Sequence, residues 1–574
     1  MYINSKREKG IVLIVATFFL LFLLGVVIKK EEKDAFIRTE AIGKFCQGEK
    51  VGIYKSGLDT SEQSSEILIG WWEDNENEKK YFFLPSGSWK QKFVWMIPDS
   101  MSVSIENEEI YTGDEFDLSQ GEYEVVIEKD DVKNVCVLEV LESSKIASLF
   151  MKLEENGLEY IHREKGNSAA GNYLVLDAQG RVENLGKIEA IRGRGNVSWV
   201  DSDKKSYQIT LQEKKSLLGM PAEKKWVLIP NAFDDTLIRN KVCNDLAHGL
   251  GLEHTTKCGY IDLYIDGEYR GNYLLSEKVE IDNNRIAINN LEKENEILNK
   301  DIELAQNIKK VNDNGVVIKG SILENEPEDI TGGYLLELES PKRFENEKNG
   351  FITSRGQCVI VQSPEYASEK QLSYIAERYQ CFENAIYSED GHCPFDGKGF
   401  TEYIDIESFA KKYLLEELSK NHDAHITSQF FYKPEDKISD KIFAGPAWDY
   451  DKALGINAQN YVGLDLKIPE GIHVGVQKRD YDVWYGLYCQ EEFMDVVYQI
   501  FKSELEWIVK KEVNYAIPDL VFEIEDSVKM NHIRWNVYGN LTMEEKIGRY
   551  RKEVFEIQDF LVNRMEFLED EWNL

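Results

Sequence analysis

Apolar and polar residues alternate with a period of two in short stretches of residues 46–142. The apolar positions fall in short runs, which are EILIGWW, KYFFL, KFVWMI, SVSIE and YEVVIE. Such runs, bounded by Gly, Asn, Asp and Ser, are typical of half-buried strands. The pattern predicts a small β-sandwich-like module over residues 46–142, in which no residue suggests catalysis.

A mixed pattern follows from about residue 143. It predicts a strand that ends in a Gly-rich turn at 187–199, followed by two further strands at 204–211 and 224–231. A helix is expected at 234–251, and a pair of strands around an Asp-Gly turn at 259–281. An Asp precedes the helix, whose Leu237, Val242, Leu246 and Leu250 share one face.

The second half of the chain changes from strands to helices. Residues 287–330 are charged and predict an insertion, and GGYLLELE (332–339) predicts a strand. An amphipathic helix is expected at 404–421, and the chain beyond 480 is mainly helical. The fold class predicted for the main domain, residues 143–574, is therefore α+β.

Residues 11–28, IVLIVATFFLLFLLGVVI, carry no charge. As a helix they extend about 27 Å, close to the thickness of the hydrocarbon core of a bilayer. Basic residues precede them, and KKEEKD follows without a small-residue cleavage pattern. We expect an uncleaved membrane anchor at 1–30 and a tether at 31–45. A short basic tail before a long domain favours an extracellular main domain, although basic residues on the two sides nearly balance.

The chain of 574 residues has a net charge of −35. This acidity argues against a nucleic-acid partner, because phosphate backbones require concentrated positive charge. It leaves a basic protein substrate possible. The eight cysteines form no CxxC and no zinc spacing, so disulfides Cys243–Cys258 and Cys381–Cys393, or free thiols, all remain open.

NHDAHITSQFFYK (421–433) and GPAWDYDKALG (445–455) bring three aspartates together across one predicted hairpin. Phosphoryl transfer needs a carboxylate that faces the attacking hydroxyl and oxygen ligands that hold a metal. We expect Asp423 to orient the acceptor, and Asp449 and Asp451 to bind Mg²⁺. A helix followed by Asp, strand, turn, strand and Asp repeats the order of a kinase catalytic loop (here 421–428) and metal loop (here 449–451).

The Gly-rich turn R-G-R-G-N-V-S-W is a candidate phosphate-binding loop, because Gly193 and Gly195 allow close approach of the backbone. The candidate polar groups around the phosphates are Arg192, Arg194, Asn196, Lys205 and Lys225.

Structural explanations compete for the same residues. The three aspartates can cap a turn or tie a loop, lysines at strand edges are usually solvated, and Arg194 and Asn196 can stabilise their own turn. His422 and His425 have no third ligand in view, which favours a structural role over zinc.

The sequence resembles the CotH-type spore-coat protein kinases, an atypical branch of the protein-kinase-like fold. The resemblance covers about residues 145–460, through the ordered blocks IRGRGNVSW, KKSYQITL, SLLGM, KKWVLIPN, DDTLIRN, IDLYIDGEYRGNYLLSEKVEI, GGYLLELE, NHDAHITSQFFYK and GPAWDYDKALG. It implies a two-lobed domain, with an N-lobe at about 143–340 and a C-lobe at about 365–574. It also implies ATP, Mg²⁺ or Mn²⁺, and a serine-containing protein segment as substrate.

In this resemblance Asp423 matches the catalytic aspartate, and Asp449 and Asp451 match the metal acids. Glu277–Val279 would lie near the adenine-binding hinge. The family often has a metal-binding asparagine after the catalytic aspartate, where this chain has Ser428 and Gln429, and the amide of Gln429 is the better ligand. Helix 234–251 also lacks a glutamate to pair with a strand lysine, and Asp245 is its nearest acid.

Three functions follow as hypotheses. The first is a membrane-anchored, outward-facing protein kinase of the CotH type. The second is a non-catalytic surface or coat protein that keeps the fold for binding. The third is a metal-dependent glycosyltransferase, which would require an early nucleotide-binding βαβ pattern where the sequence predicts a β-rich meander.

Overall fold

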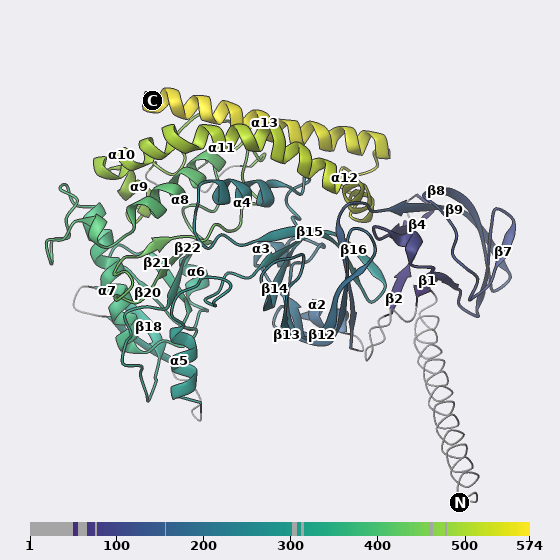
Figure 1. The fold of residues 1–574 in the computed structure, drawn as a ribbon, viewed down its shortest axis with the longest axis horizontal. Coiled ribbons are helices and arrows are strands. Elements are labelled where there is room, and N and C mark those ends of the chain that lie inside the picture. Colours follow the sequence, from purple (N-terminus) through teal and green to yellow (C-terminus); the bar gives the residue numbers. More distant parts are fainter. Residues whose placement is uncertain are drawn as a thin grey trace, which may run out of the picture. The chain divides into compact units, whose positions relative to one another are not determined.

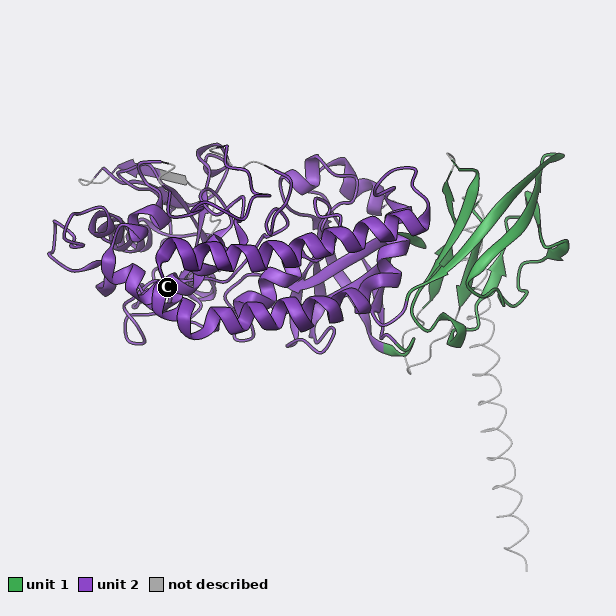
Figure 2. Cartoon of the chain, turned by 90° about the horizontal axis from the view of Figure 1, so that it is seen from above, with its two compact units in different colours: residues 1–143, 179–182, 264–269 green, residues 144–178, 183–263, 270–574 purple. Residues whose placement is uncertain are grey.

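A computed structural model describes residues 50–55, 66–74, 77–154, 157–300, 307–311, 315–458, 463–476 and 479–574. The expected membrane anchor (1–30) and tether (31–45) lie outside these ranges. Within them, no helix combines the length and the apolar character needed to cross a bilayer. The chain divides into two compact units, which are coloured separately in Figure 2: residues 1–143, 179–182 and 264–269, and residues 144–178, 183–263 and 270–574.

The described part of the first unit contains two β-sheets. One has the order β2-β1-β5, with bounds Ile67–Gly70, Gly52–Lys55 and Val94–Met96. The other has the order β3-β4-β9-β8-β6-β7, with bounds Trp72–Asp74, Lys79–Leu84, Val132–Glu142, Gly121–Lys129, Met101–Ile105 and Glu108–Ile110. Phe82 of β4 packs edge-on against Trp95 of β5, with ring centroids 5.6 Å apart. A 3₁₀ turn, η1, spans Ser88–Lys90.

The second unit begins with most of a closed barrel, whose strand order is β10-β11-β12-β13-β14-β16-β15 (Figure 1). The strands are Ala147–Leu153, Ser168–Leu176, Val182–Gly193, Tyr207–Lys215, Glu223–Ile229, Glu268–Glu277 and Cys258–Ile265. Helix α2, Gly157–Arg163, precedes β11. The Gly-rich turn and the short helix α3, Val197–Val200, join β12 to β13. The predicted order of strands around this turn is therefore confirmed.

Helix α4 spans Arg239–Gly249 and is shorter than the predicted helix at 234–251. Asp234 explains the difference. Its carboxylate accepts hydrogen bonds from the backbone N–H groups of Thr236 and Arg239, at 3.0 and 2.8 Å. These bonds form a turn ahead of the helix, so the helix begins at Arg239.

A second sheet has the order β17-β18-β20-β21-β19-β22-β23. Its strands are Asn307–Val311, Val317–Ser321, Gly350–Ile352, Cys358–Ser363, Tyr334–Glu339, Gln429–Lys433 and Phe443–Ala444. The charged insertion contributes β17, β18 and helix α5, Leu291–Leu298. Antiparallel pairing places Glu337 of β19 opposite Phe430 of β22.

Helices pack around this sheet and along the barrel in Figure 1. Besides the 3₁₀ turn η2 (Phe400–Glu402) and the π-helical segments η3 (Phe501–Leu505) and η4 (Glu512–Ala516), they are α6 Pro341–Phe344, α7 Glu369–Ile386, α8 Ile406–Ser419, α9 Val483–Tyr488, α10 Glu491–Ile500, α11 Glu506–Lys511, α12 Ile517–Arg534 and α13 Met543–Trp572. Helix α8 is the predicted amphipathic helix. Asp405 caps it by accepting the Ser408 N–H at 2.9 Å, and Phe409 stacks on Phe431 of β22. The α+β class is confirmed.

Candidate active site

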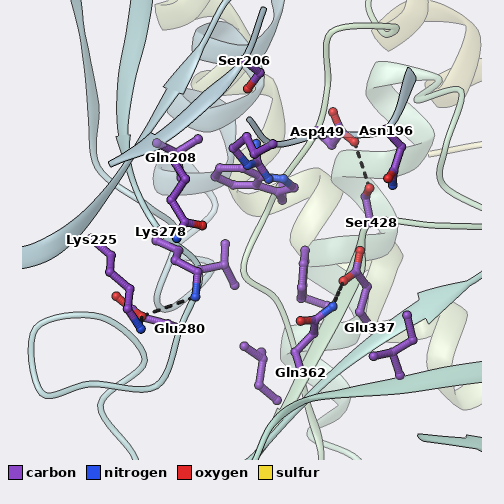
Figure 3. Close-up of a pocket in the computed structure, with 18 of the residues that line it drawn as sticks. Asn196, Ser206, Gln208, Lys225, Lys278, Glu280, Glu337, Gln362, Ser428 and Asp449 are labelled. Carbon is purple, nitrogen blue, oxygen red and sulfur yellow. Dashed lines mark hydrogen bonds and ion pairs between the residues drawn. The ribbon is translucent and has the colours of Figure 1, made fainter. Parts of the chain in front are cut away.

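A cavity of about 1070 Å³ lies in the second unit. Its lining comes from the Gly-rich turn, β13, β14, the segment after β16, β19, β21, the catalytic loop and the metal loop (Figure 3). The sequence-predicted residues that line it are Arg192, Arg194, Asn196, Lys225, Asp423, Asp449 and Asp451. The three aspartates and the Gly-rich turn, which lie more than 220 residues apart in sequence, therefore share one cavity.

The three aspartates influence one another electrostatically. Burial raises the pKa of Asp449, and the charge of Asp423 raises it further. Burial raises the pKa of Asp451 well above its ordinary value, and Asp449 and Asp423 add to that effect. Acids that are crowded in this way in a buried place repel one another, and a bound cation relieves the repulsion.

Two residues at the site have left-handed backbone conformations. Ser428 has a φ of 58° and Asp449 a φ of 70°. The Ser428 hydroxyl donates a hydrogen bond to the Asp449 carboxylate at 2.9 Å (Figure 3). Such strain in residues other than glycine persists where the surrounding structure enforces it, which is common at active sites.

The glycines of the Gly-rich turn are required by space and by conformation. A Cβ on Gly193 would lie 2.4 Å from ring carbons of Trp199. Gly195 has a φ of 78°. The turn places the Arg194 guanidinium 5.1 Å from the centre of the Trp448 ring. Burial lowers the pKa of Arg194, and the charges of Asp449 and Glu337 oppose that effect.

An apolar surface forms another part of the cavity wall. Val227 and Ile229 of β14 line it together with Leu335 and Phe430. Leu335, Phe430 and Ile281 belong to one buried apolar cluster. A flat, largely apolar ring fits such a wall, whereas the Gly-rich turn and the acids offer charged and polar groups. The cavity therefore suits a ligand that has a ring and a charged part.

The sequence model of the family described as CotH kinase protein matches residues 191–568. This chain belongs to the CotH kinase family. The matched region holds the Gly-rich turn, the catalytic loop, the metal loop and most of α13. Strands β10 and β11 and most of β12 precede it. No curated protein matches the chain significantly.

Three predicted residues do not line the cavity of this CotH kinase family member. The Lys205 ammonium donates to the Trp199 carbonyl at 2.6 Å and lies over the ring of the same residue. Glu277 pairs with Arg285 at 2.8 Å. Gln429 stands opposite Leu338, a core residue, and both polar atoms of its buried side chain lack a hydrogen-bond partner. Cross-strand partners point to the same face of a sheet, so Gln429 points away from the cavity.

Lys225 does line the cavity. Its ammonium lies 3.2 Å from Glu280, which also pairs with Lys278 at 3.5 Å (Figure 3). Burial lowers the pKa of Lys278. Lys278 is the first residue after β16, where the resemblance implies the hinge, and Lys225 of β14 reaches the same segment through Glu280.

His425 is buried and structural. Its Nδ1 lies 2.7 Å from an Asp482 carboxylate oxygen, and its Nε2 lies 3.2 Å from the carbonyl of His473. The structure thus agrees with the interpretation that His425 has a structural role. His422 differs, because its Nδ1 lies 3.0 Å from the carboxylate of Asp423 itself.

Sequence reasoning missed Glu337 of β19, which lines the cavity on the same face as Phe430. Gln362 donates to its carboxylate at 2.7 Å (Figure 3). Burial raises the pKa of Glu337 to about 8, with contributions from Glu339 and Asp449. The signal was an acid in the apolar strand YLLELE, although the strand pattern alone does not say which face the acid occupies.

A divalent metal fits the donor set of this site. Asp449 and Asp451 offer the hard oxygen atoms that Mg²⁺ and Mn²⁺ prefer. Across the described ranges, no three His, Cys, Asp or Glu side chains are placed to hold a metal ion together. Nucleotide enzymes usually bind Mg²⁺ through one or two carboxylates, and phosphate oxygens and waters complete the shell. Two acids are therefore sufficient for such a site.

Proposed function

We propose that this chain is an ATP- and divalent-metal-dependent phosphotransferase that modifies serine in a protein segment. The observation that carries the proposal is the shared cavity of Asp423, Asp449, Asp451 and the Gly-rich turn. Family membership supports a kinase-like activity. We also propose that the barrel and the helical region around the second sheet correspond to the two lobes of a kinase-like domain.

In this proposal the adenine ring lies against Val227, Leu335 and Phe430, and the phosphates lie below the Gly-rich turn. Arg192 and Arg194 offer positive charge to the phosphate oxygens, and Arg194 stays oriented by its contact with Trp448. Asp449 and Asp451 would hold the metal, which supplies positive charge to the phosphates when bound.

Asp423 orients the serine hydroxyl and accepts its proton. The serine oxygen forms a bond to the γ-phosphorus, while the bond from that phosphorus to the bridging oxygen of ADP breaks. The products are phosphoserine and ADP, and the proton resides on Asp423 until solvent removes it. Such a reaction depends mainly on positioning and electrostatic stabilisation, which a preformed cavity supplies.

The proposal is tested with the purified full chain, labelled ATP, and Mg²⁺ or Mn²⁺. Incorporation of label into casein or into the chain itself at serine supports it. Absence of both labelling and calorimetrically detected ATP binding would reject it.

One observation favours a second candidate, a binding protein without catalysis. Gln429, the residue expected to supply an amide ligand, points away from the cavity. A chain that binds metal-ATP but transfers no phosphoryl group would support this candidate. The antiparallel barrel at the start of the second unit gives no support to the glycosyltransferase hypothesis, which requires a βαβ nucleotide fold.

We propose that residues 1–30 anchor the chain, with 31–45 as tether, 46–142 as a β-rich module and 143–574 as an extracellular main domain. The uncharged stretch 11–28 supports the anchor. Digestion of intact cells with added protease tests the orientation, because an extracellular domain is cleaved while cytoplasmic proteins stay intact.

A further inference from the structure

Glu416 of α8 forms the centre of a buried network behind the cavity. It is completely buried, and so are Lys412 and Asn421. One carboxylate oxygen of Glu416 accepts hydrogen bonds from the Tyr450 hydroxyl and the Lys412 ammonium, both at 2.6 Å. The other oxygen accepts from the Asn421 side-chain amide at 2.9 Å. Both oxygens of one carboxylate thus have partners, and none of these residues lines the cavity.

One side of the network reaches the metal loop. Tyr450 stands between Asp449 and Asp451 in sequence, and its backbone N–H donates to the Asn240 side chain of α4 at 2.8 Å. Its hydroxyl contacts Glu416 and, at 2.8 Å, Lys412. Because Tyr450 is held at its backbone and at its hydroxyl, the directions of its two aspartate neighbours are restricted.

The other side of the network reaches the catalytic loop. The Asn421 side-chain oxygen accepts the backbone N–H of Asp423 at 3.2 Å. The same side chain donates to Glu416. Glu416 therefore connects the backbone of the candidate catalytic residue to the residue between the two metal acids, through one hydrogen-bonding side chain on each side.

The buried charges of the network indicate a role in positioning rather than in stability. A buried ion pair often stabilises a fold no better than apolar residues of the same size. The Lys412–Glu416 pair is at 0% side-chain exposure for both partners. A charged acceptor, however, forms stronger and more directional hydrogen bonds than a neutral one. Such a pair is well suited to fix two loops relative to each other.

We infer that Glu416 is a positioning residue that holds the catalytic loop and the metal loop in register through Asn421 and Tyr450. This inference rests on the phosphotransfer function proposed above. Besides packing, α8 thereby has the role of positioning the two loops. Among the described residues, Glu416 of α8 is the only carboxylate that accepts hydrogen bonds from both Asn421 and Tyr450.

Tyr450→Phe is the primary test, since Glu416→Gln would leave the buried Lys412 without its charged partner and can prevent folding. The phenylalanine keeps the ring and the ion pair but removes the link to the metal loop. We expect kcat to fall at least tenfold. We also expect Mn²⁺ affinity, measured by electron paramagnetic resonance with a non-hydrolysable ATP analogue, to weaken at least threefold.

Tyr413→Phe is the matched control. Tyr413 is also buried, and its hydroxyl donates to the neighbouring acid Glu417 at 3.4 Å rather than to a residue of the catalytic loop or the metal loop. We expect this variant to keep the kcat and Mn²⁺ affinity of the wild type. Equal losses in both variants would show that removing any buried tyrosine hydroxyl near Glu416 or Glu417 acts through packing alone, and would overturn the inference.

A double-mutant cycle with Asn421→Ala gives the second readout. If both residues act through Glu416, the loss of kcat in Asn421→Ala/Tyr450→Phe is smaller than the product of the two single losses. Independent, multiplying losses would overturn the inference. If the wild type binds ATP and transfers phosphate while Tyr450→Phe behaves identically, only the inference fails. If the wild type neither binds ATP nor transfers phosphate, both the proposed function and the inference fail.

Discussion

Ser428 and Asp449 are joined by a hydrogen bond of 2.9 Å between two residues that both have left-handed backbone conformations. The bond ties the end of the catalytic loop to the start of the metal loop. A left-handed conformation costs about 1–2 kcal/mol for each residue that is not glycine. The fold thus maintains two unfavourable conformations at one place, which is expected where a site has to be preorganised.

Asp423→Asn is expected to reduce phosphoryl transfer by at least about 100-fold, because an amide cannot accept the proton of the serine hydroxyl. ATP binding should remain near the wild-type level, since Asp423 faces the acceptor. Labelled phosphate transfer and calorimetric ATP binding measure the two effects. Transfer at the wild-type rate would remove Asp423 from the proposed mechanism.

Asp451→Asn is expected to have opposite effects on function and stability. Metal-dependent ATP binding should be lost, because one of two metal ligands is replaced. Without metal, the variant should unfold at a higher temperature than the wild type, since burial and neighbouring acids raise the pKa of Asp451 and make its ionised form unfavourable. Calorimetry with and without Mn²⁺ measures both effects. A lower unfolding temperature without metal would contradict the repulsion between the acids.

Gly193→Ala is expected to destabilise the Gly-rich turn. The new Cβ would lie 2.4 Å from the Trp199 ring, so the ring or the strand has to shift, at a cost of about 1–3 kcal/mol. ATP affinity should fall with it. Gly548→Ala in α13 is the control, because its Cβ would meet no atom within 4 Å, and alanine favours a helix. Chemical denaturation measures both variants, and equal stabilities would contradict the role of the ring.

Glu337 is expected to make stability depend on pH. Its pKa is about 8 in the folded protein against an ordinary value of 4.5, so between these values the folded state keeps a proton that the unfolded state has lost. The stabilisation of the folded state by the proton on Glu337 is therefore fully present below about pH 4.5 and is lost as the pH rises towards 8. Glu337→Gln should gain stability relative to the wild type over this range, and the difference should level off above pH 8.

Thermal unfolding from pH 5 to pH 9, without metal or nucleotide, measures the Glu337 effect. Glu345→Gln serves as the control, because Glu345 is an exposed acid at the end of α6, the helix that follows β19. A difference between Glu337→Gln and the wild type that stays constant across this range would show that Glu337 titrates normally.

Local patterns predicted much of the main domain. The amphipathic period of α8, the Asp-Gly turn between β15 and β16 and the glycines at the end of β12 all appear where the sequence placed them. These features depend on residues close in sequence, because capping, turn conformation and helix periodicity are local properties. The order of Asp423, strand, turn, strand and Asp449 was visible for the same reason.

Tertiary structure alone decided which side chains enter the cavity. Gln429 and Ser428 are neighbours, yet Ser428 lines the cavity and Gln429 does not. Glu337 enters because β19 pairs with β22 in a register that sets it opposite Phe430. A shift of that register by one residue would exchange the two faces of the strand. Strand pairing across about 90 residues is a long-range property, so the sequence determined which acids were available, and the packing of the sheet against α8 determined which of them face the site.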